Sequence, residues 1–416
     1  MKVLHETIEN FPIIIPENND SPRIQRAINY CDINDIGILK ATGTYLLGVP
    51  IELPSNFKIE GLSPIRTKFI LKSGVTAFSV YGKRNIVIED IAIDGEGRIG
   101  TRAFTSNGES TTLMFRNVWV DSVKIGFDLE FTYFVGIENV RIMGTPLPFL
   151  FRNSSNVINL TNCSTVVPAS NETEYSGNSV VAFNGSCLNI KGCAFEGEGA
   201  GIRIYNWSGA NIDGSYFENQ SKTSINNSWI TLGTGNGSKA KGITIQGCNF
   251  TGGFKGAVSL LSIEGLSSNG NVFETDVFAY EMYQYDNSPK VNLDFGQNAY
   301  KTGITRIKYL GNTTNNQNSN NSESQITPLL FVKQKEPQNS HIENDSFAIY
   351  TTTAGKIESK SKTSTGEVSS GVLGRFVPVP KTSSSVGNTG DWSANSTHLF
   401  VCYATNAWRR IAFNAW

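Results

Sequence analysis

The stretch Phe115-Arg-Asn-Val-Trp-Val-Asp121 has the same pattern as Ile190-Lys-Gly-Cys-Ala-Phe-Glu196. In both, the third residue tolerates an unusual backbone, the fourth and sixth are apolar, and the last is acidic. Self-similarity at a fixed period predicts a solenoid in which each repeat forms one coil. Six further segments fit the frame at intervals of 22 to 33 residues: Ile88–Asp94, Ile137–Met143, Leu160–Val166, Ile212–Glu218, Ile245–Thr251 and Ser268–Glu274.

The third position of the frame determines how the chain bends. Asp, Asn and Gly all accept a left-handed backbone, whereas β-branched residues do not. Eight such residues in register predict a sharp bend at the same place in every coil. They are Asp90, Asn117, Asn139, Asn162, Gly192, Gly214, Gly247 and Gly270.

Residues on either side of this bend alternate with the period of a strand, so one set of side chains should point inward. Phe195, Phe217, Phe250 and Phe273 then stack along one axis, and Ile91, Val118, Val140, Cys163, Cys193, Ser215 and Cys248 form a second inward column. Asn271 fits this second column imperfectly. We predict an all-β fold, a right-handed parallel β-helix with three strands per coil and coils about 4.8 Å apart.

The ends of such a rod need caps. Ser21–Tyr30 reads as a short amphipathic helix, with Ser21 as N-cap and Pro22 in the first turn. Next along the chain come Gly43-Thr-Tyr45 and then Ile51-Glu-Leu-Pro-Ser-Asn-Phe-Lys-Ile-Glu-Gly61. This order resembles the N-terminal entry of the pectin-lyase-like superfamily, and the resemblance covers residues 17–311. It implies the fold and not a particular chemistry.

The polar, low-complexity segment Asn312–Gln325 is expected to be a linker or loop. Residues 326–416 are expected to form a small C-terminal β domain. Its strand-like runs are Leu329–Val332, Ser346–Thr351, Gly374–Val379, Leu399–Tyr403 and Trp408–Phe413.

The tail carries Gly390-Asp-Trp392, then Val401-Cys-Tyr-Ala-Thr-Asn-Ala-Trp408, and ends at Trp416. It resembles the C-terminal segment of bacteriophage tailspike and tail fibre proteins. The resemblance implies a homotrimer on a virion, acting at the host cell surface and often cleaving a surface polysaccharide. The C-terminal domain would then serve trimerisation or receptor binding, and residues 1–16 could attach to phage tail or baseplate proteins. Trp392, Trp408 and Trp416 fit a domain core and a trimer interface equally well.

The composition narrows the possible partners. A net charge of −1 with 17% charged residues gives no electrostatic bias toward nucleic acid or anionic membranes. No apolar run approaches the length of a membrane helix, and Met1–Glu6 lacks the apolar stretch of a signal peptide. The six cysteines show no zinc-ligand spacing, so we expect small core residues and no metal or cofactor.

Acidic residues are the best catalytic candidates, because residues 6–340 contain no histidine. The last position of the frame points outward and pairs acids on neighbouring coils: Glu196 with Glu218, and as second choice Asp94 with Asp121. In-register carboxyls about 5 Å apart match a retaining glycosidase, whereas Glu198 with Asp213 or Glu218 could give the wider inverting spacing. A solvated column of acids is the alternative interpretation of both pairs.

Candidate substrate-binding residues follow the first acid pair in the sequence. Arg203 and Tyr205 are expected to face outward, with Trp207 just beyond and Trp229 one coil later. Aromatic faces stack on sugar rings and arginine pairs with acidic sugars. The sequence therefore favours residues 196–231 as a groove for a bacterial surface polysaccharide, although the aromatic residues could equally be trimer contacts.

Two other functions stay open on these residues. Asn117-Val-Trp-Val-Asp-Ser122 resembles a pectate lyase motif with Ser122 in place of its histidine, and an arginine base such as Arg116 or Arg141 would suit a polysaccharide lyase. A tail protein that only binds glycan would need the same fold without cleavage.

Overall fold

The computed structural model describes the chain apart from short gaps and a longer one at 311–345. The described residues are 5–14, 17–168, 177–198, 201–218, 228–235, 237–252, 256–275, 277–283, 290–302, 304–310, 346–351, 357–362, 368–372, 379–386, 388, 391–394 and 398–412. The chain divides into two compact units, Met1–Asn312 and Thr313–Trp416.

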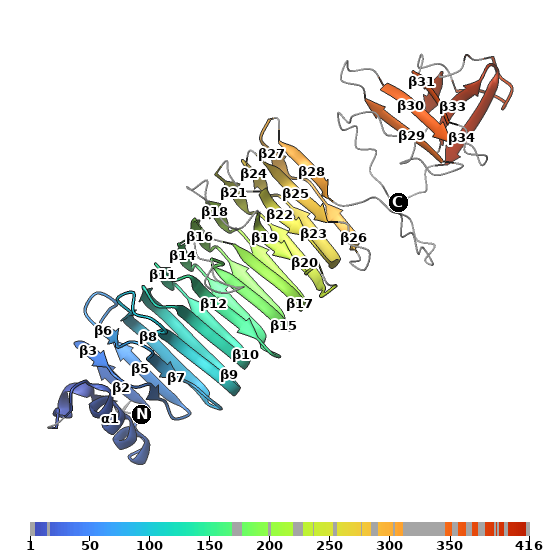
Figure 1. Ribbon diagram of the computed structural model, residues 1–416. Coiled ribbons are helices and arrows are strands. Elements are labelled where there is room, and N and C mark those ends of the chain that lie inside the picture. The colour runs from blue at the N-terminus through green and yellow to red at the C-terminus, as the bar shows by residue number, and fades with distance from the viewer. Residues whose placement is uncertain are drawn as a thin grey trace. The chain divides into compact units, whose positions relative to one another are not determined.

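The first unit is a parallel β-solenoid of about ten turns in which strands stack along one axis (Figure 1). One run of parallel pairings contains the strands that precede the repeated corner. These are β1 (His5–Thr7), β2 (Ile38–Ala41), β5 (Phe57–Gly61), β8 (Arg84–Asp94), β9 (Arg102–Asp121), β10 (Ile125–Glu138), β13 (Asn156–Thr161), β15 (Val180–Lys191), β17 (Ile202–Asp213), β20 (Ala240–Gln246), β23 (Ile263–Asn269) and β26 (Lys290–Phe295).

Two further runs complete the solenoid. The run after the corner joins the ends of β8 and β9 with β3 (Thr44–Leu47), β6 (Lys68–Leu71), β11 (Arg141–Met143), β14 (Ser164–Val167), β16 (Ala194–Gly197), β18 (Tyr216–Glu218), β21 (Asn249–Thr251), β24 (Val272–Phe273) and β27 (Ala299–Tyr300). The last run joins the first parts of β9, β10, β15 and β17 with β4 (Ile51–Glu52), β7 (Thr76–Ser79), β12 (Leu147–Arg152), β19 (Ser228–Leu232), β22 (Gly256–Leu260), β25 (Phe278–Tyr283) and β28 (Thr305–Leu310).

The repeated corner is confirmed at every predicted position. All eight residues have left-handed backbone, with φ between 48° at Asn117 and 66° at Gly270. The asparagine side chains also reinforce the stack, since Asn117 Nδ2 donates to Asp90 Oδ1 at 2.6 Å. The corner therefore sets the register of the strands on both sides of it.

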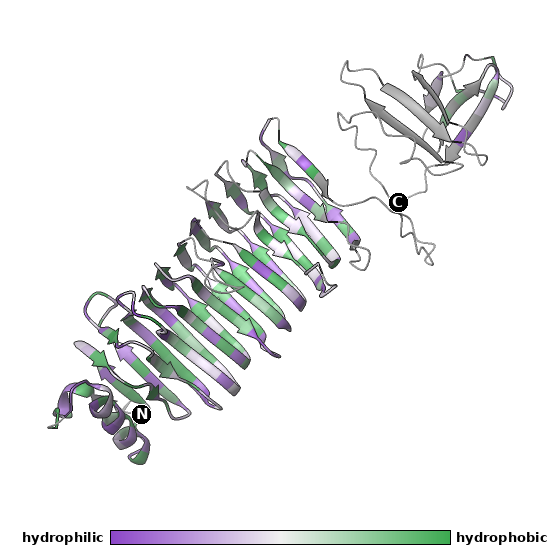
Figure 2. Cartoon of the chain, viewed as in Figure 1, coloured by the Kyte–Doolittle hydropathy of each residue, from purple (hydrophilic) through white to green (hydrophobic). Residues whose placement is uncertain are grey.

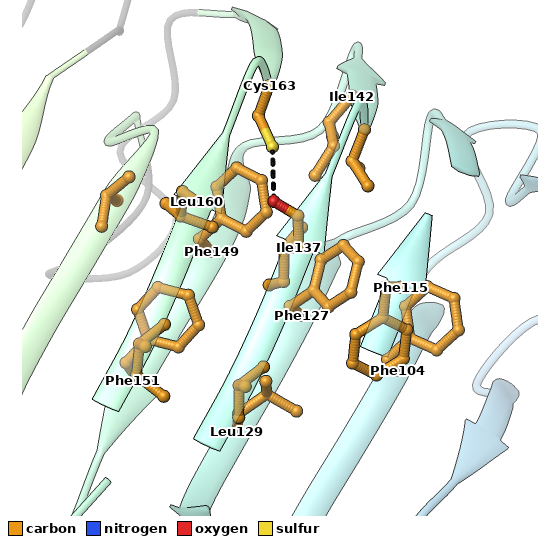
Figure 3. Packing of buried hydrophobic residues seen from close by; sticks show 14 of the residues in the cluster. Phe104, Phe115, Phe127, Leu129, Ile137, Ile142, Phe149, Phe151, Leu160 and Cys163 are labelled. Carbon is orange, nitrogen blue, oxygen red and sulfur yellow. Dashed lines mark hydrogen bonds between the residues drawn. The ribbon is translucent and has the colours of Figure 1, made fainter. Parts of the chain in front are cut away.

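The core includes the predicted inward columns, and Figure 2 shows hydrophobic and hydrophilic residues alternating along the strands of the solenoid. Phe195, Phe217, Phe250 and Phe273 stack with ring centroids 4.7–5.2 Å apart, and Tyr300 continues the stack at 5.3 Å. Figure 3 shows a second phenylalanine stack, on the third run of strands in earlier coils, where the rings of Phe104, Phe127 and Phe149 lie 4.6 and 5.3 Å apart. Such offset ring pairs add attraction to the area that they bury.

The cysteines behave as small core residues except at one place. All six are free thiols, and five are buried while Cys187 is exposed. The Cys163 thiol donates to the carbonyl of Ile137 at 3.3 Å (Figure 3). Asn271 occupies the end of this column without an unsatisfied amide, because its Oδ1 accepts from the Cys248 amide and its Nδ2 donates to the Ile245 carbonyl, both at 2.9 Å.

The N-terminal cap is a helix, but its first turn differs from the prediction. Helix α1 spans Ser21–Ile33, and its N-cap is Asp20, not Ser21. Ser21 instead donates to the Val49 carbonyl at 2.8 Å, and Asp20 accepts from the Leu46 amide at 2.8 Å. Both side chains thus fasten the helix to the chain beyond it. The buried face of α1 consists of Ser21, Ile24, Ala27, Ile28 and Cys31, and a short 3₁₀ helix η1 (Ile8–Asn10) precedes it.

The second unit contains two antiparallel sheets: β29 (Ser346–Thr351), β30 (Ile357–Lys362) and β31 (Val368–Val372), then β32 (Trp392–Ala394), β33 (His398–Ala404) and β34 (Ala407–Ala412). The predicted run Ser346–Thr351 is strand β29, and the predicted runs near 399–403 and 408–413 lie in β33 and β34. Trp408 is buried and its Nε1 donates to the Ser385 carbonyl at 2.9 Å. Asn312–Gln325, Leu329–Val332, Trp416 and most of Gly374–Val379 lie outside the described residues.

The corner can be tested at Gly247, whose φ is 61° and where an added Cβ would be no closer than 3.7 Å to any neighbouring atom. Gly247→Val should destabilise the protein by about 1–2 kcal/mol, because a β-branched residue is strained in this backbone. Gly247→Asn should cost much less, since Asn tolerates it. Thermal or denaturant unfolding of both variants checks this. Equal unfolding midpoints for the two variants would show that the corner imposes no such requirement.

Candidate functional site

Glu196 and Glu218 occupy matching positions on neighbouring strands. β16 and β18 pair in parallel, with Glu196 directly opposite Glu218, and both side chains are half-buried. The next position along this run is Thr251 of β21. We call the outward positions Asp94, Asp121, Glu196 and Glu218 the acid ladder. Cα partners on paired parallel strands lie about 4.8 Å apart, so the two glutamate carboxyls are neighbours.

Tyr216 connects directly to this pair. Its hydroxyl donates to Glu218 Oε2 at 2.8 Å. Burial, and next this hydrogen bond with the charge of Glu218, raises the pKa of Tyr216 to about 12, and Glu196 and Glu274 add to the effect. The phenol therefore stays protonated and remains a hydrogen-bond donor at neutral pH. Tyr216 was not singled out from the sequence, although its place two residues before Glu218 puts it on the same face of a strand.

The other two predicted acids, Asp213 and Glu198, are outside the acid ladder as defined by register. Asp213 ends β17, before the Gly214 corner, and is in register with Lys191 and Gln246. Glu198 is exposed and follows the end of β16. The left-handed corner between Asp213 and Glu218 turns the chain, so nearness in sequence does not place these two acids on one face.

Asp94 and Asp121 form the other pair of the ladder, and their surroundings differ. They are in register on β8 and β9. Asp94 is paired with Lys68 at 2.6 Å and accepts from the Glu96 amide at 2.7 Å. Burial, followed by the charge of Asp94, raises the pKa of Asp121. Asp94 thus has a lysine partner, whereas the carboxyl of Asp121 has a pKa above its usual range.

Arg203 and Tyr205 lie together on β17. The Arg203 guanidinium is 5.7 Å from the Tyr205 ring centroid, and Tyr205 stacks on Phe183 of β15 with centroids 5.2 Å apart and planes within 4°. Phe183 of β15 is in register with Arg152 of the neighbouring strand β12. Arginine and aromatic rings therefore share one half-buried face, which suits sugar stacking and anion pairing.

We expected Trp207 and Trp229 to present their rings to a ligand. This expectation is wrong, because both side chains are buried in the core cluster. Asn206 has φ 48°, and this left-handed residue turns Trp207 inward beneath Gly185, where an added Cβ would be 2.3 Å from the ring. Trp229 packs on Phe217 with centroids 5.9 Å apart. Strand β19 begins only at Ser228, so alternation from Thr231 does not extend reliably to residue 229.

A charged cluster on the third run of pairings was not found from the sequence. Asp128 of β10 is only 3% exposed and pairs with Arg152 at 3.0 Å and Arg102 at 3.2 Å. Arg152 also contacts Glu130 at 3.3 Å. These acids lie outside the repeat frame, and only the strand register reveals their partners. Their pairing with arginine gives Asp128 and Glu130 a structural role.

Two further features of the described residues concern metal binding and membrane insertion. Among the described residues, no group of three His, Cys, Asp or Glu side chains gathers as a metal site would require. The helices in the described ranges are too short or too polar to cross a membrane.

Comparison with known sequences gives two short matches, and no family model matches the chain. A capsule K30/K69-specific depolymerase of Klebsiella phage K64-1 is 42% identical over 45 residues, 11% of this chain and 6% of that protein. Depolymerase 1, also described as capsule K30/K69-specific, of Klebsiella phage K5-2 is 50% identical over 42 residues, 10% of this chain and 5% of that protein. These local similarities bear out the resemblance to phage proteins, but the matched part is a small fraction of each relative.

Comparison with solved structures concerns the fold. DFA-IIIase from Arthrobacter chlorophenolicus A6 aligns over 71% of this chain and 83% of its own, with TM-score 0.51 and 12% identity. The tailspike of E. coli bacteriophage HK620 aligns over 73% of this chain and 65% of its own, with TM-score 0.44 and 14% identity. The first of these alignments supports the β-solenoid and carries nothing about chemistry.

The raised pKa of Asp121 has a consequence for stability. Its folded-state pKa lies above the unfolded value, so its contribution to stability is present at low pH and is lost as the pH rises through the folded-state pKa. Asp121→Asn keeps the shape and removes the charge. It should therefore raise the free energy of unfolding at pH 7 and leave it nearly unchanged at pH 3.

Denaturant unfolding at the two pH values measures this, with Asp32→Asn on the exposed face of α1 as control. A stabilisation of equal size at both pH values, or a loss of stability at pH 7, would contradict the assigned cause.

Proposed function

We propose that this chain is a phage tailspike that binds and depolymerises a bacterial surface polysaccharide, a capsule or an O-antigen, by glycoside hydrolysis. The observation that carries the proposal is the in-register pair Glu196 and Glu218. The local similarity to phage capsule depolymerases supports the substrate class. A right-handed winding with three strands per coil, homotrimerisation through residues 326–416 and attachment through residues 1–16 belong to the same proposal.

The two glutamates take different roles in this mechanism. Glu218, which accepts a hydrogen bond from the Tyr216 hydroxyl, is assigned the role of nucleophile. Glu196, its in-register neighbour, is assigned the role of general acid that protonates the leaving oxygen. A separation of about 5 Å suits attack by Glu218 on the sugar carbon and a covalent intermediate, and hence retention of configuration.

The described surroundings of this pair contain no cation that neutralises it. Among the described residues, no lysine or arginine forms an ion pair with Glu196 or Glu218. In the second pair, by contrast, Lys68 forms an ion pair with Asp94. An acid pair without a resident cation is free to exchange protons with a substrate. The face that carries Arg203, Tyr205 and Phe183 would hold the polymer alongside. Asp94 and Asp121 stay the second choice for the catalytic pair.

The test uses purified capsular polysaccharides, including types K30 and K69, and three readouts. New reducing ends without ultraviolet absorbance indicate hydrolysis, an unsaturated absorbing product indicates a lyase, and binding without either indicates an adhesive protein. We expect hydrolysis, with Glu196→Gln and Glu218→Gln each lowering the rate at least about 100-fold while binding persists. Glu109→Gln, an exposed acid on β9, should change nothing. Full activity of both Gln variants would remove this pair from the mechanism.

A further inference from the structure

A groove separate from the acid ladder runs along the solenoid, with a volume of about 640 Å³. Its length comes from five lining residues in register on successive strands: Tyr133, Asn156, Ser186, Ser208 and Lys241. Four steps between paired strands make this row about 19 Å long. We call this depression the corner groove. It is long enough for several sugar units and belongs to the run of strands before the repeated corner.

Strained backbone borders the corner groove. Phe134, Val157 and Cys187 each follow a residue of the lining row, and all three have left-handed backbone, with φ 55–56°. Glycine takes over the same position at Gly209 and Gly242. A β-branched or bulky residue in this conformation is unusual, and such strain is found where a functional arrangement requires it.

The opposite side of the groove presents amide groups in a row. Asn206 Nδ2 donates to Asn184 Oδ1 at 2.6 Å, and Asn184 Nδ2 lies 3.5 Å from Asn153 Oδ1. All three asparagines have left-handed backbone, and Asn184 and Asn206 line the groove. Because each amide is fixed by its neighbour, its remaining donor and acceptor sites point in a constant direction, as a binding surface for sugar hydroxyls requires.

Two polar atoms of lining residues have no partner. Asn156 Oδ1 and the Nε1 of the buried Trp207 are both buried and form no hydrogen bond in the described structure. Buried polar groups in folded proteins are nearly always paired. These two unpaired atoms mark the wall of the corner groove as an exception to this rule.

The charge of the lining is positive. Lys239 and Lys241 line the groove, and its lining includes no carboxylate. Glu264 contacts both ammonium groups, at 3.5 and 3.7 Å, and all three side chains are 39–53% exposed. A single carboxylate therefore leaves one positive charge in excess at this end of the groove, and exposed ammonium groups remain able to bind another anion.

We propose that the corner groove binds a carboxylate-bearing stretch of a polysaccharide, with Lys239 and Lys241 on the acidic sugar and the amide row on its hydroxyls. This rests on the proposed function only for the nature of the polymer. The groove holds the chain while the acid ladder, on different strands, acts elsewhere on it. A carboxylated glycan is thus the substrate class that the protein prefers.

Cys187 offers a test that needs no mutation. It lies at the edge of the groove and is exposed, whereas the other five cysteines are buried. The probes are polygalacturonate, hyaluronate and the K30 and K69 capsular polysaccharides, each beside its carboxyl-reduced form. At least one acidic polymer should slow maleimide labelling of Cys187 in the full chain about five-fold or more, and its reduced form should not. Absence of protection by every acidic polymer, or equal protection by a reduced form, overturns the proposal.

A charge-matched pair of variants gives the second arm. Lys239→Ala/Lys241→Ala should weaken binding of the protecting polymer at least about ten-fold, while Lys83→Ala/Arg84→Ala near the start of β8 should not, and unfolding curves confirm that both variants are folded. Unchanged binding by the groove variant rejects the groove. Two variants separate the claims. Cleavage that the lysine substitutions leave unchanged supports the hydrolase without the groove. Binding by Glu218→Gln that still depends on the two lysines, whether or not any cleavage is seen in the wild type, supports the groove without the hydrolase.

Discussion

Parallel pairing between successive coils is the constraint on which the rest of this structure depends. Every coil must place its backbone groups opposite those of the next coil, because a buried unpaired amide is costly. The left-handed corners make this possible by turning each coil at the same position, from Asp90 to Gly270. Successive frames are 22 to 33 residues apart. The extra residues of the longer repeats come between the paired strands in the sequence, so the columns stay in register.

Because the strands are in register, the sequence repeat becomes columns of side chains in space. Side chains of like charge that stack in one column repel one another, and neighbouring groups must reduce this repulsion. The solenoid does this in three ways. Lys68 neutralises Asp94, Arg102 and Arg152 surround Asp128, and Tyr216 supplies a neutral donor to Glu218. Among the described residues, the third solution leaves Glu196 and Glu218 without an ion-pair partner, and the proposed mechanism moves a proton at this pair. Inside the solenoid, the same stacking produces apolar columns, which include the stacked phenylalanines.

The core was predictable from the sequence because Gly, Asn and Asp mark one corner in every coil. A second left-handed column was missed because it holds Thr112, Phe134, Val157 and Cys187, residue types that give no such signal. A third, Asn153, Asn184 and Asn206, was visible as asparagine after an aromatic or charged residue, and it would have placed Trp207 inside. The cap helix was predicted, but its N-cap is Asp20 and not Ser21, because the Ser21 hydroxyl bonds to the distant Val49 carbonyl. Asp128 could not be predicted, since its arginines come from other coils.

The neighbour relation of Glu196 and Glu218 is the claim to test most directly, and cross-linking does so. Paired strands bring their Cα atoms within the range for a disulfide. In a Cys187→Ser background, Glu196→Cys/Glu218→Cys should oxidise to one intramolecular disulfide, detected by mass and by reduction. Glu196→Cys/Thr251→Cys, one strand further along the run, should stay reduced. A bond in the second protein and none in the first would contradict the register, and with it the acid pair.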